Sequence, residues 1–440
     1  MVEKLNRRDF LKINTAATVG LTLTGLRLNE ANAEQPKIVR VGLVGTGNRG
    51  RSLLSVLLEM EGVEVPALCD INLQKLAAAQ DMVVKAGRNQ PEGYSKDEYV
   101  FQQLMGRDDL DAVIIATPWK WHTPMAVYGM KAGKYAGVEV PAAQTLEDCW
   151  QLVNTSQETR VPCMMLENWS FRRDNLAVLN MIRQGLLGEI VHCHCAHSHD
   201  CIDHWFFDAD TGADRWSAEY LLKRNRDQYP SHQLGPVISW MDIGCGDYFD
   251  YLTSTATDGF GINDYFIRKF GPDHPNAKLK YAQGDVVTTV VRTKKGKSLV
   301  INYDMQLPRP YDNRWTIQGT RGIYNEQRNS VYLTGQSPQY HQWESFDPYQ
   351  EKYEHGWWKA IKGEAGQFSH EGTDYLELIH FLKAVRQKTQ TPLDVYDAVI
   401  MSVTGPLSEL SIAQGSAPVK VPDFTRGKWK TNQRSFALET

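Results

Sequence analysis

Five short apolar runs lie between residues 34 and 166, and each has the length of one buried strand. They span residues 37–44, 63–69, 111–116, 135–141 and 161–166. The segments between them are more polar and include an apolar-rich helical stretch at 51–59. Continuous rather than alternating apolar runs are typical of parallel strands that are covered on both faces. The pattern therefore predicts an α/β domain with a parallel sheet over residues 34–166.

The second part of the chain, residues 167–440, has a different pattern. Helical periodicity occurs at 174–184, 374–387 and 395–414. An alternating run begins at Ile190, and β-branched or alternating runs follow at 285–292, 298–305, 314–319 and 331–333. Such runs, joined by turn residues, favour antiparallel pairing, so we predict an α+β domain with a mainly antiparallel sheet. Residues 340–372 have no clear period and are expected to form a long ordered excursion.

Residues 1–33 have the order of a secretory signal. Arg7 and Arg8 precede a mildly apolar stretch at 13–26, and a small-x-small site follows at 31–33. The paired arginines indicate the twin-arginine export machinery as a partner, and the periplasm or the exterior as the destination. The apolar stretch is too short and too polar to span a bilayer, so no membrane anchor is expected. A frayed amphipathic terminus is the alternative.

The composition of the chain limits the classes of partner that it can bind. Its 440 residues have a net charge of −4 and no run of basic residues, which argues against nucleic acid. The seven cysteines are odd in number and scattered, unlike those of a disulfide scaffold. This usage fits folding in the reducing cytoplasm before export.

A glycine motif follows the first apolar run directly. Gly45, Gly47 and Gly50 have the G-x-G-x-x-G spacing, and Asp70 ends the next run twenty residues after Gly50. Such glycines permit a tight turn and let backbone N–H groups approach a pyrophosphate at a helix N-terminus. The acid can accept both ribose hydroxyls and repels a 2′-phosphate. The sequence thus predicts a Rossmann domain that binds NAD; a glycine turn with a chance acid is the alternative.

Other candidates for cofactor contact lie between the glycines and at the later strand ends. They are Asn48, Arg49, Trp119, Lys120, Trp121, His122, Glu139, Val140 and Asn168. Each alone is more typical of a cap or a turn. Ligands of parallel sheets, however, gather at the carboxyl ends of the strands. We therefore expect Trp119, His122, Glu139 and Asn168 to ring the nicotinamide.

Histidine and cysteine are concentrated between residues 192 and 204. On a strand, alternation puts His192 and His194 on one face and the odd-numbered residues 193–199 on the other. Neither a C-x-x-C nor an H-x-x-x-H spacing occurs, so a sheet face lining a substrate cleft near His199 is preferred and no metal is predicted. A zinc site stays the alternative.

The stretch Tyr229-Pro230-Ser231-His232 is a second candidate for chemistry, expected in a loop before a helix that begins at Val237. A histidine and a neighbouring tyrosine can move protons at a sugar carbon and hydroxyl. Without further context, Tyr-Pro is a turn and His232 is a helix-start residue.

Taken in order, these motifs resemble glycoside hydrolase family 109, a branch of the glucose–fructose oxidoreductase (Gfo/Idh/MocA) superfamily. The motifs are 45–50, 119–122, Glu139-Val140-Pro141, Glu167-Asn168, His199-Asp200, 229–232, Arg309-Pro310-Tyr311 and Pro422-Asp423-Phe424. The resemblance covers nearly the whole chain after residue 33. Many sugar dehydrogenases of the superfamily have lysine at the position of Val140. The glycosidase branch, like this chain, has valine there.

The resemblance implies an α-N-acetylgalactosaminidase with tightly held NAD and no net redox change. The implied steps are oxidation at the sugar C3, removal of the C2 proton, elimination of the C1 aglycone, addition of water and reduction at C3. Tyr229 and His232 would move protons, and Glu139 would lie beside the nicotinamide. The implied sugar site comprises His197, His199, Tyr229, Pro230, Ser231, His232 and Tyr311. A small-molecule glycoside and a homo-oligomer formed through the second sheet are the partners implied.

Three positions depart from the family pattern. His197 replaces a tyrosine, Ser217 replaces the arginine of a Trp-Arg pair, and Glu371 interrupts a His-Gly-Gly segment. They spare the cofactor residues but leave the sugar, the anomer and the aglycone open. Two other classes also stay open: an NAD-dependent sugar dehydrogenase that releases NADH, and a non-catalytic sugar-binding protein with structural NAD. Export and Val140 disfavour the dehydrogenase.

Replacing both signal arginines (Arg7→Lys with Arg8→Lys) is expected to keep the precursor inside the cell, because the signal is read by a receptor. Immunoblots of cytoplasmic and periplasmic fractions, with the unsubstituted precursor beside it, measure this. Normal export of the double variant would contradict the twin-arginine assignment.

Overall fold

The computed structural model describes residues 38–361 and 372–438, which belong to one compact unit. The proposed export signal at 1–33, with Arg7 and Arg8, lies outside the described residues, as does Glu371. None of the helices in the described ranges is long and apolar enough to cross a membrane.

Six parallel strands form the first sheet, in the order β3-β2-β1-β4-β5-β6. The strands are β1 (Val39–Val44), β2 (Val63–Cys69), β3 (Glu92–Tyr94), β4 (Ala112–Ile115), β5 (Tyr135–Val138) and β6 (Cys163–Met165). The helices between them are α2 (Asn48–Glu59), α3 (Leu73–Lys85), α4 (Phe101–Met105), α5 (His122–Lys131) and α6 (Leu146–Thr159). All residues of β4 are buried, as its continuous apolar run predicts. The order is that of a dinucleotide-binding sheet, which confirms the predicted fold class.

The second sheet has nine strands, in the order β14-β13-β12-β11-β7-β10-β9-β8-β15. They are β7 (Ile190–Ser198), β8 (Phe249–Ala256), β9 (Val286–Thr293), β10 (Ser298–Asp304), β11 (Thr316–Gly319), β12 (Gly322–Asn325), β13 (Ser330–Leu333), β14 (Glu344–Ser345) and β15 (Val419–Lys420). All neighbouring pairs are antiparallel except β7 and β10, which are parallel. The long connection between β7 and β10 makes that crossover possible. The mainly antiparallel sheet is therefore confirmed.

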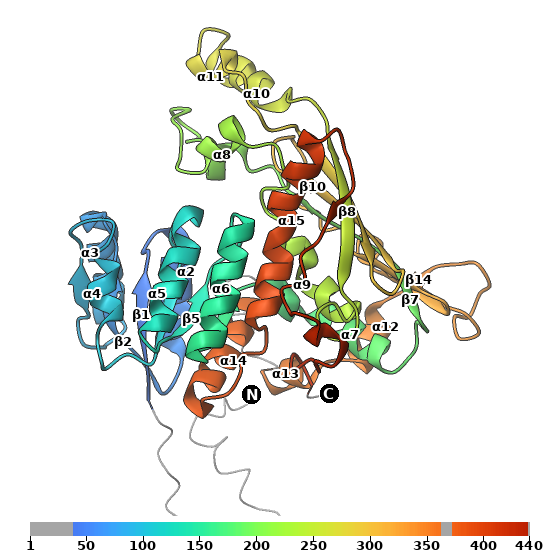
Figure 1. Ribbon diagram of the computed structural model, residues 1–440, viewed down its shortest axis with the longest axis horizontal. Coiled ribbons are helices and arrows are strands. Elements are labelled where there is room, and N and C mark those ends of the chain that lie inside the picture. Colours follow the sequence, from blue (N-terminus) through green and yellow to red (C-terminus); the bar gives the residue numbers. More distant parts are fainter. Residues whose placement is uncertain (1–37, 362–371, 439–440) are drawn as a thin grey trace, which may run out of the picture. The chain divides into compact units, whose positions relative to one another are not determined.

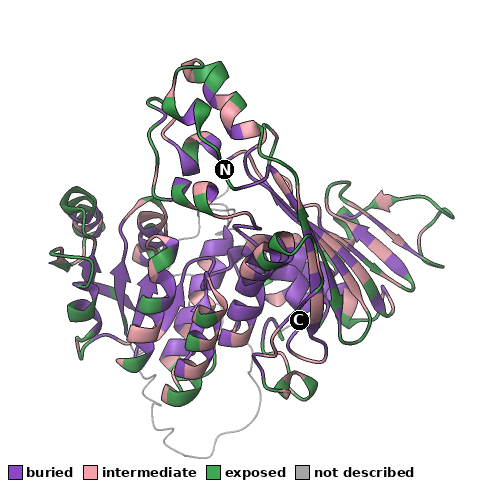
Figure 2. Ribbon diagram, turned by 45° about the horizontal axis from the view of Figure 1, so that its top comes forward, coloured by how far each residue is buried: buried purple, intermediate pink, exposed green. Residues whose placement is uncertain are grey.

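Helices cover one face of the second sheet. They include α7 (Arg173–Arg183), α9 (Ser231–Trp240) and α15 (Val395–Ala413), of which α9 packs on β7 and α15 on β8. On β9, buried Val287 and Val291 alternate with exposed Val290 and Arg292. Figure 2 shows buried residues interspersed with exposed and intermediate ones along these strands. Assembly through the exposed side stays a prediction.

Two helices from the end of the chain return to the first sheet. Helix α15 contacts α6 as well as β8, and Figure 1 shows α15 standing between the two. Helix α14 (Thr373–Gln387) contacts α2 and β1. Because α15 is apolar around most of its circumference, it is a buried helix that packs both sheets together.

Several features differ from the sequence expectations. Helix α2 begins at Asn48 rather than at residue 51, so the last glycine of the motif lies inside the helix. Helix α9 begins at Ser231 rather than at Val237, because Pro230 forms its N-cap. Strand β8 was not predicted. The described part of the excursion, residues 340–361 and 372, contains strand β14 and the short helices α12 (Asp347–Lys352) and α13 (Gly356–Ala360).

Candidate active site

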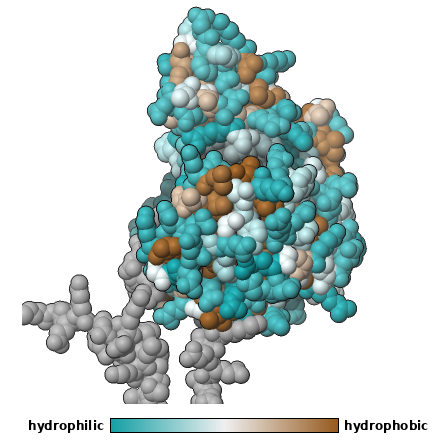
Figure 3. Space-filling model, turned by 90° about the vertical axis from the view of Figure 1, so that its left-hand side faces the viewer, coloured by the Kyte–Doolittle hydropathy of each residue, from teal (hydrophilic) through white to brown (hydrophobic). Residues whose placement is uncertain are grey.

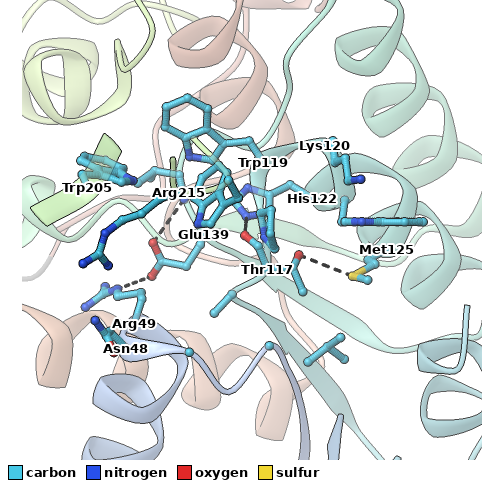
Figure 4. Close-up of a pocket in the computed structure, with 18 of the residues that line it drawn as sticks. Asn48, Arg49, Thr117, Trp119, Lys120, His122, Met125, Glu139, Trp205 and Arg215 are labelled. Carbon is cyan, nitrogen blue, oxygen red and sulfur yellow. Dashed lines mark hydrogen bonds and ion pairs between the residues drawn. The ribbon is translucent and has the colours of Figure 1, made fainter. Parts of the chain in front are cut away.

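A cavity of about 1380 Å³ lies at the carboxyl ends of the first-sheet strands and extends to the end of β7 and the start of α9. Every predicted contact residue lines it except Gly50, Pro230 and Ser231. Pro230 and Ser231 are instead buried at the start of α9. Figure 3 shows hydrophobic side chains gathered in the middle of one face, on a surface that is otherwise mainly hydrophilic. Figure 4 shows the cavity wall around Glu139 and Trp119.

The three motif glycines have three different surroundings. Gly45 has φ +89°, and a Cβ there would lie 2.5 Å from the Ala116 carbonyl oxygen. A Cβ on Gly50 would lie 1.9 Å from the carbonyl oxygen of Gly45. A Cβ on Gly47, by contrast, would meet no atom within 4 Å. Gly45 and Gly50 thus close the turn, while Gly47 leaves space for a ligand at the N-terminus of α2, as a pyrophosphate requires.

Asp70 lies immediately after β2 and faces the cavity. Its carboxylate accepts hydrogen bonds from the backbone N–H of Thr46 at 2.8 Å, from Thr46 Oγ1 at 3.1 Å and from the N–H of Asn72 at 2.8 Å. A carboxylate has about four acceptor positions, so one remains for a ribose hydroxyl. These contacts also fix the carboxylate against the glycine turn.

The residues after β4 form one wall of the cavity. Trp119 and Trp121 belong to a short 3-10 turn, and Lys120 lies between them on the exposed side. His122 is buried, with Nδ1 2.9 Å from the Pro141 carbonyl oxygen and Nε2 2.7 Å from that of Thr117. Burial lowers its pKa, so the ring is neutral at pH 7 and donates to one of the two carbonyls. His122 therefore braces two strand ends beside the predicted nicotinamide site.

Arg49 joins three segments that are distant in sequence. Its Nε donates to Glu139 at 2.6 Å, and Nη1 and Nη2 donate to the two carboxylate oxygens of Asp374, on α14, at 2.7 and 3.0 Å. Asp374 also accepts from Asn168 Nδ2 at 2.8 Å. The link between Arg49 and Glu139 is drawn in Figure 4. The carbonyl oxygen of the Asn168 side chain is buried without a described partner, so it can accept from a bound cofactor.

His232 is held by a buried carboxylate. Glu167 Oε1 lies 2.7 Å from His232 Nδ1, and its other oxygen accepts from the N–H and Oγ of Ser170 at 2.8 and 2.6 Å. Burial raises the pKa of Glu167 to about 8, so this pair shares one proton at neutral pH. A Cβ on Gly235 would lie 1.8 Å from Glu167 Oε2, which makes glycine necessary there. The arrangement leaves His232 Nε2 facing Tyr229, whose hydroxyl is 3.4 Å away.

Tyr229 is enclosed by aromatic rings. Trp119 stacks on it with ring centroids 5.9 Å apart, and Trp205 meets it edge-on at 4.7 Å. Burial raises the pKa of the Tyr229 hydroxyl well above 10, an effect to which Glu139 adds. Tyr229 thus keeps its proton at neutral pH and acts as a donor.

His197 lies at the inner end of the cavity. It is 2% exposed, and neither ring nitrogen has a hydrogen-bond partner among the described residues. Burial lowers its pKa well below 6.5, so it is neutral at pH 7 and offers one donor and one acceptor. Tyr311 and His232 both lie 5.5 Å from it between ring centroids, and His199 lies 6.1 Å away. A buried polar ring without a partner at a cavity wall fits a ligand group.

Sequence reasoning missed several residues at this site. The departure at Ser217 does not face the cavity, since its hydroxyl donates to the Trp205 carbonyl at 2.6 Å; Arg215 and Trp216 line the cavity instead. Glu167 was part of a strand-end motif but was not assigned a role. Trp205, in the π-turn Ile202–Phe206, had no spacing signal. His204 was noted only within the His/Cys cluster, and Asp374 only as the start of a predicted helix; neither was assigned to the site.

Comparison with known families agrees with this geometry. A model of the C-terminal domain of glycosyl hydrolase 109 matches residues 171–431, and one of the oxidoreductase family with an NAD-binding Rossmann fold matches residues 39–167. The chain belongs to glycoside hydrolase family 109. It is therefore a glycoside hydrolase that carries an NAD-binding Rossmann domain.

Relatives of this family 109 chain match it from end to end. An alpha-N-acetylgalactosaminidase from Tannerella forsythia is 38% identical over 98% of this chain and 99% of its own. A glycosyl hydrolase family 109 protein from Shewanella baltica is 39% identical over 98% of both chains.

Solved structures share the fold at lower identity. An NAD binding oxidoreductase from Klebsiella pneumoniae has a TM-score of 0.69 at 18% identity, over 88% of this chain and 99% of its own. The myo-inositol dehydrogenase from Lactobacillus casei, in complex with NAD(H) and myo-inositol, has a TM-score of 0.61 at 16% identity, over 88% of this chain and 97% of its own. The resemblance to these oxidoreductases supports the fold.

The glycine turn gives a matched pair of tests for the cofactor. We expect the purified chain to carry NAD, measured by acid release and an enzymatic NAD assay. Gly47→Ala should keep the melting temperature of the NAD-free protein but weaken NAD binding, because its methyl group enters the ligand space. Gly50→Ala should lower both, because its Cβ meets the Gly45 carbonyl. A chain without NAD and without affinity for added NAD would contradict the cofactor assignment.

Proposed function

We propose that this family 109 hydrolase is an exported glycosidase that uses tightly bound NAD in an oxidation–elimination–addition–reduction cycle. The observation that carries the proposal is the position of His232 and Tyr229. Both line the same cavity as Gly47 and Asp70, and a buried carboxylate orients the histidine. Cofactor residues and proton-moving residues thus share one enclosed space.

The glycine turn and Asp70 fit NAD, as the open space at Gly47 indicates. Bound NAD supplies a hydride acceptor and, later in the same turnover, a hydride donor. Glu139 and Asn168 bound the inner part of this site, and the contacts of Arg49 hold both in place. An exported protein has no dependable supply of free NAD, so a cofactor that is regenerated within each turnover suits the proposed location.

His232 is the group proposed to move the C2 proton. Nδ1 is engaged by Glu167, so Nε2 is the nitrogen that can take a proton from the substrate and return it. Glu167 is a positioning residue: it fixes the tautomer and the orientation of the ring. This cycle needs no pair of carboxylates on either side of the glycosidic bond, unlike ordinary glycosidases.

Tyr229 is proposed as the hydrogen-bond donor to a sugar hydroxyl or keto oxygen. Its raised pKa keeps the hydroxyl protonated at neutral pH, and the hydroxyl lies within reach of His232 Nε2, so a proton can be relayed between the two. The wall of tryptophan rings around it offers apolar faces of the kind that sugar rings pack against.

The substrate we propose is an α-N-acetylgalactosaminide or a related uncharged glycoside. The activity in the name of the Tannerella relative supports the first choice. His197 places a neutral ring where the family pattern has tyrosine, and Arg215 places a guanidinium at the cavity although Ser217 replaces the usual arginine. These two residues are the ones we expect to set the sugar preference.

The alternative functions predict different products. A sugar dehydrogenase would release NADH in proportion to the sugar added and leave the glycosidic bond intact. A non-catalytic binding protein would bind a glycoside without turnover, and Glu167 would then have no histidine chemistry to support. The buried contact between Glu167 and His232 favours catalysis over binding alone. We also propose a homo-oligomer formed through the exposed side of the second sheet.

A panel of chromogenic α- and β-glycosides tests the activity, and hydrolysis in D₂O tests the mechanism. We expect cleavage of an α-N-acetylgalactosaminide without accumulation of NADH. Deuterium should appear at C2 of the released sugar, because the proton removed there is returned after exchange with solvent. Cleavage without label at C2, and full activity after NAD is stripped, would contradict the redox cycle.

Variants of the histidine pair test the assigned roles. His232→Ala should lower kcat by about 10²–10⁴-fold, the range for a positioned acid–base group. Glu167→Gln should lower it by up to about 10⁴-fold, as when the carboxylate that orients a catalytic histidine becomes an amide. Both should retain bound NAD. Glu409→Gln, a carboxyl outside the cavity, is the control and should keep full activity. Unchanged kcat in both site variants would contradict the assignment.

The dependence of kcat/KM on pH should reflect the protonation of the same pair, Glu167 and His232. Since burial raises the pKa of Glu167 to about 8, the pair holds its extra proton below that pH. We therefore expect kcat/KM to rise with pH and to level off above about 8. In Glu167→Gln the rise should move to lower pH, because an amide cannot share the proton. A rise that stays in place in this variant would show that another group controls it.

A further inference from the structure

We propose that His199, Cys201 and His204 form a binding site for one divalent transition-metal ion of the zinc class, open to the cavity. One potential ligand atom from each residue lies within 4.8 Å of the other two. Two imidazoles and one thiolate are a ligand set that zinc favours, and three protein ligands leave the fourth position for water or a substrate oxygen. This site goes beyond the proposed function and does not depend on it.

The backbone holds the three residues in one rigid turn. The N–H of His199 donates to Asp304 at 2.8 Å, and the N–H of Cys201 donates to Met305 at 3.1 Å, so the segment is fixed to the end of β10. The next residues form a π-turn, Ile202–Phe206, in which the Cys201 carbonyl accepts from both Trp205 and Phe206 at 3.1 and 3.3 Å. Such wide turns are frequent at functional sites. Here the turn brings His204 back beside Cys201.

Exposure changes across the cluster in the way an open metal site requires. Cys201 is fully buried, His199 is half-buried and His204 is exposed. Both histidines line the cavity, whereas the thiol lies behind them. An ion held by all three would therefore be closed on the protein side and open on the cavity side. Tyr311, a proposed sugar-site residue, lies 4.9 Å from His199 between ring centroids.

The charges around the cluster favour a cation. Asp203 Oδ1 lies 3.6 Å from His204 Nδ1, and the carboxylate of Asp200 adjoins Cys201 in the chain. Lys269 is the opposing charge, 3.6 Å from the other oxygen of Asp203. No described residue hydrogen-bonds a ring nitrogen of His199. On binding, the Cys201 thiol releases its proton to solvent and the sulfur–metal bond replaces the S–H bond.

From the sequence, a zinc site within residues 192–204 was kept as an alternative but a sheet face was preferred, because the spacing His-x-Cys-x-x-His is neither C-x-x-C nor H-x-x-x-H. Alternation along β7 ends at Ser198, so the prediction that His199 shares a strand face with His197 does not extend to it. The turn, not the strand, determines which side chains meet.

Metal titration of the untagged, NAD-loaded chain tests the proposal. After dialysis against a chelator, isothermal titration with Zn²⁺ should show one equivalent bound per chain. Co²⁺ should give a thiolate-to-cobalt charge-transfer band in the near ultraviolet. Neither reading involves a sugar or hydrolytic activity, so a failure here is distinct from a failure of the proposed function.

Two variants and two matched controls locate the ion. Cys201→Ser should abolish the charge-transfer band, and His204→Ala should weaken Zn²⁺ binding by more than about 100-fold, because changes even to groups behind metal ligands cost about 10–100-fold. Cys245→Ser, a thiol elsewhere in the fold, and His192→Ala, on the other face of β7, should bind as the parent chain does. If Cys201→Ser fails to fold, the His204→Ala variant tests the site by itself, because His204 is exposed. No stoichiometric binding, or binding unchanged in His204→Ala, would overturn the site.

Discussion

The ion pairs of Arg49 are the interaction on which the cofactor half of the cavity depends. One guanidinium from the glycine turn binds Glu139 after β5 and Asp374 on α14, the latter through both carboxylate oxygens. Asp374 is fully buried, and a buried charge is costly unless it is paired and hydrogen-bonded. Bidentate pairing with arginine meets that requirement and also fixes the geometry. The turn, two strand ends and a helix from the far end of the chain are thereby held in one arrangement.

Burial near the ion pairs of Arg49 also favours the neutral form of a neighbouring acid, Glu377. Glu377 lies one turn after Asp374 on α14, is fully buried and has no hydrogen-bond partner among the described residues. Burial and the charge of Asp374 raise its pKa well above the usual range, which favours the protonated form. Arg49 thus pairs with Glu139 and Asp374, whereas burial disfavours a charge on the neighbouring Glu377.

Glu167 organises the reactive half of the cavity in a similar way. It caps the short turn after β6 through Trp169 and Ser170, and the same carboxylate holds His232 on α9. Space for it exists only because residue 235 is glycine. The fold is shared with oxidoreductases at under 20% identity, so the chemistry of this site is argued from its own carboxylate, histidine and tyrosine. The fold thus indicates the cofactor, whereas the residues of the site indicate the chemistry.

The sequence by itself determined what local pattern controls. The buried runs of the first sheet, the glycine turn and Asp70 lie close together along the chain, so hydrophobic pattern and spacing were enough to predict them. The strand-end rule also placed Trp119, Glu139 and Asn168 at one edge, because parallel strands share their carboxyl ends. The start of α9 and strand β8 were less accessible, since Pro236 inside the helix and the polar positions of β8 obscure their periods.

Only the tertiary structure decided which distant side chains meet. Glu167 and His232 are 65 residues apart, and Arg49 and Asp374 are 325 apart. No periodicity relates such pairs, because packing of helices against sheets sets their distance. The parallel pairing of β7 with β10 and the π-turn that gathers His199, Cys201 and His204 have the same origin. Sequence pattern could therefore predict the fold and the cofactor motif. The orientation of His232, the neutral state of His197 and the cluster of His199, Cys201 and His204 follow instead from burial, which only the folded chain creates.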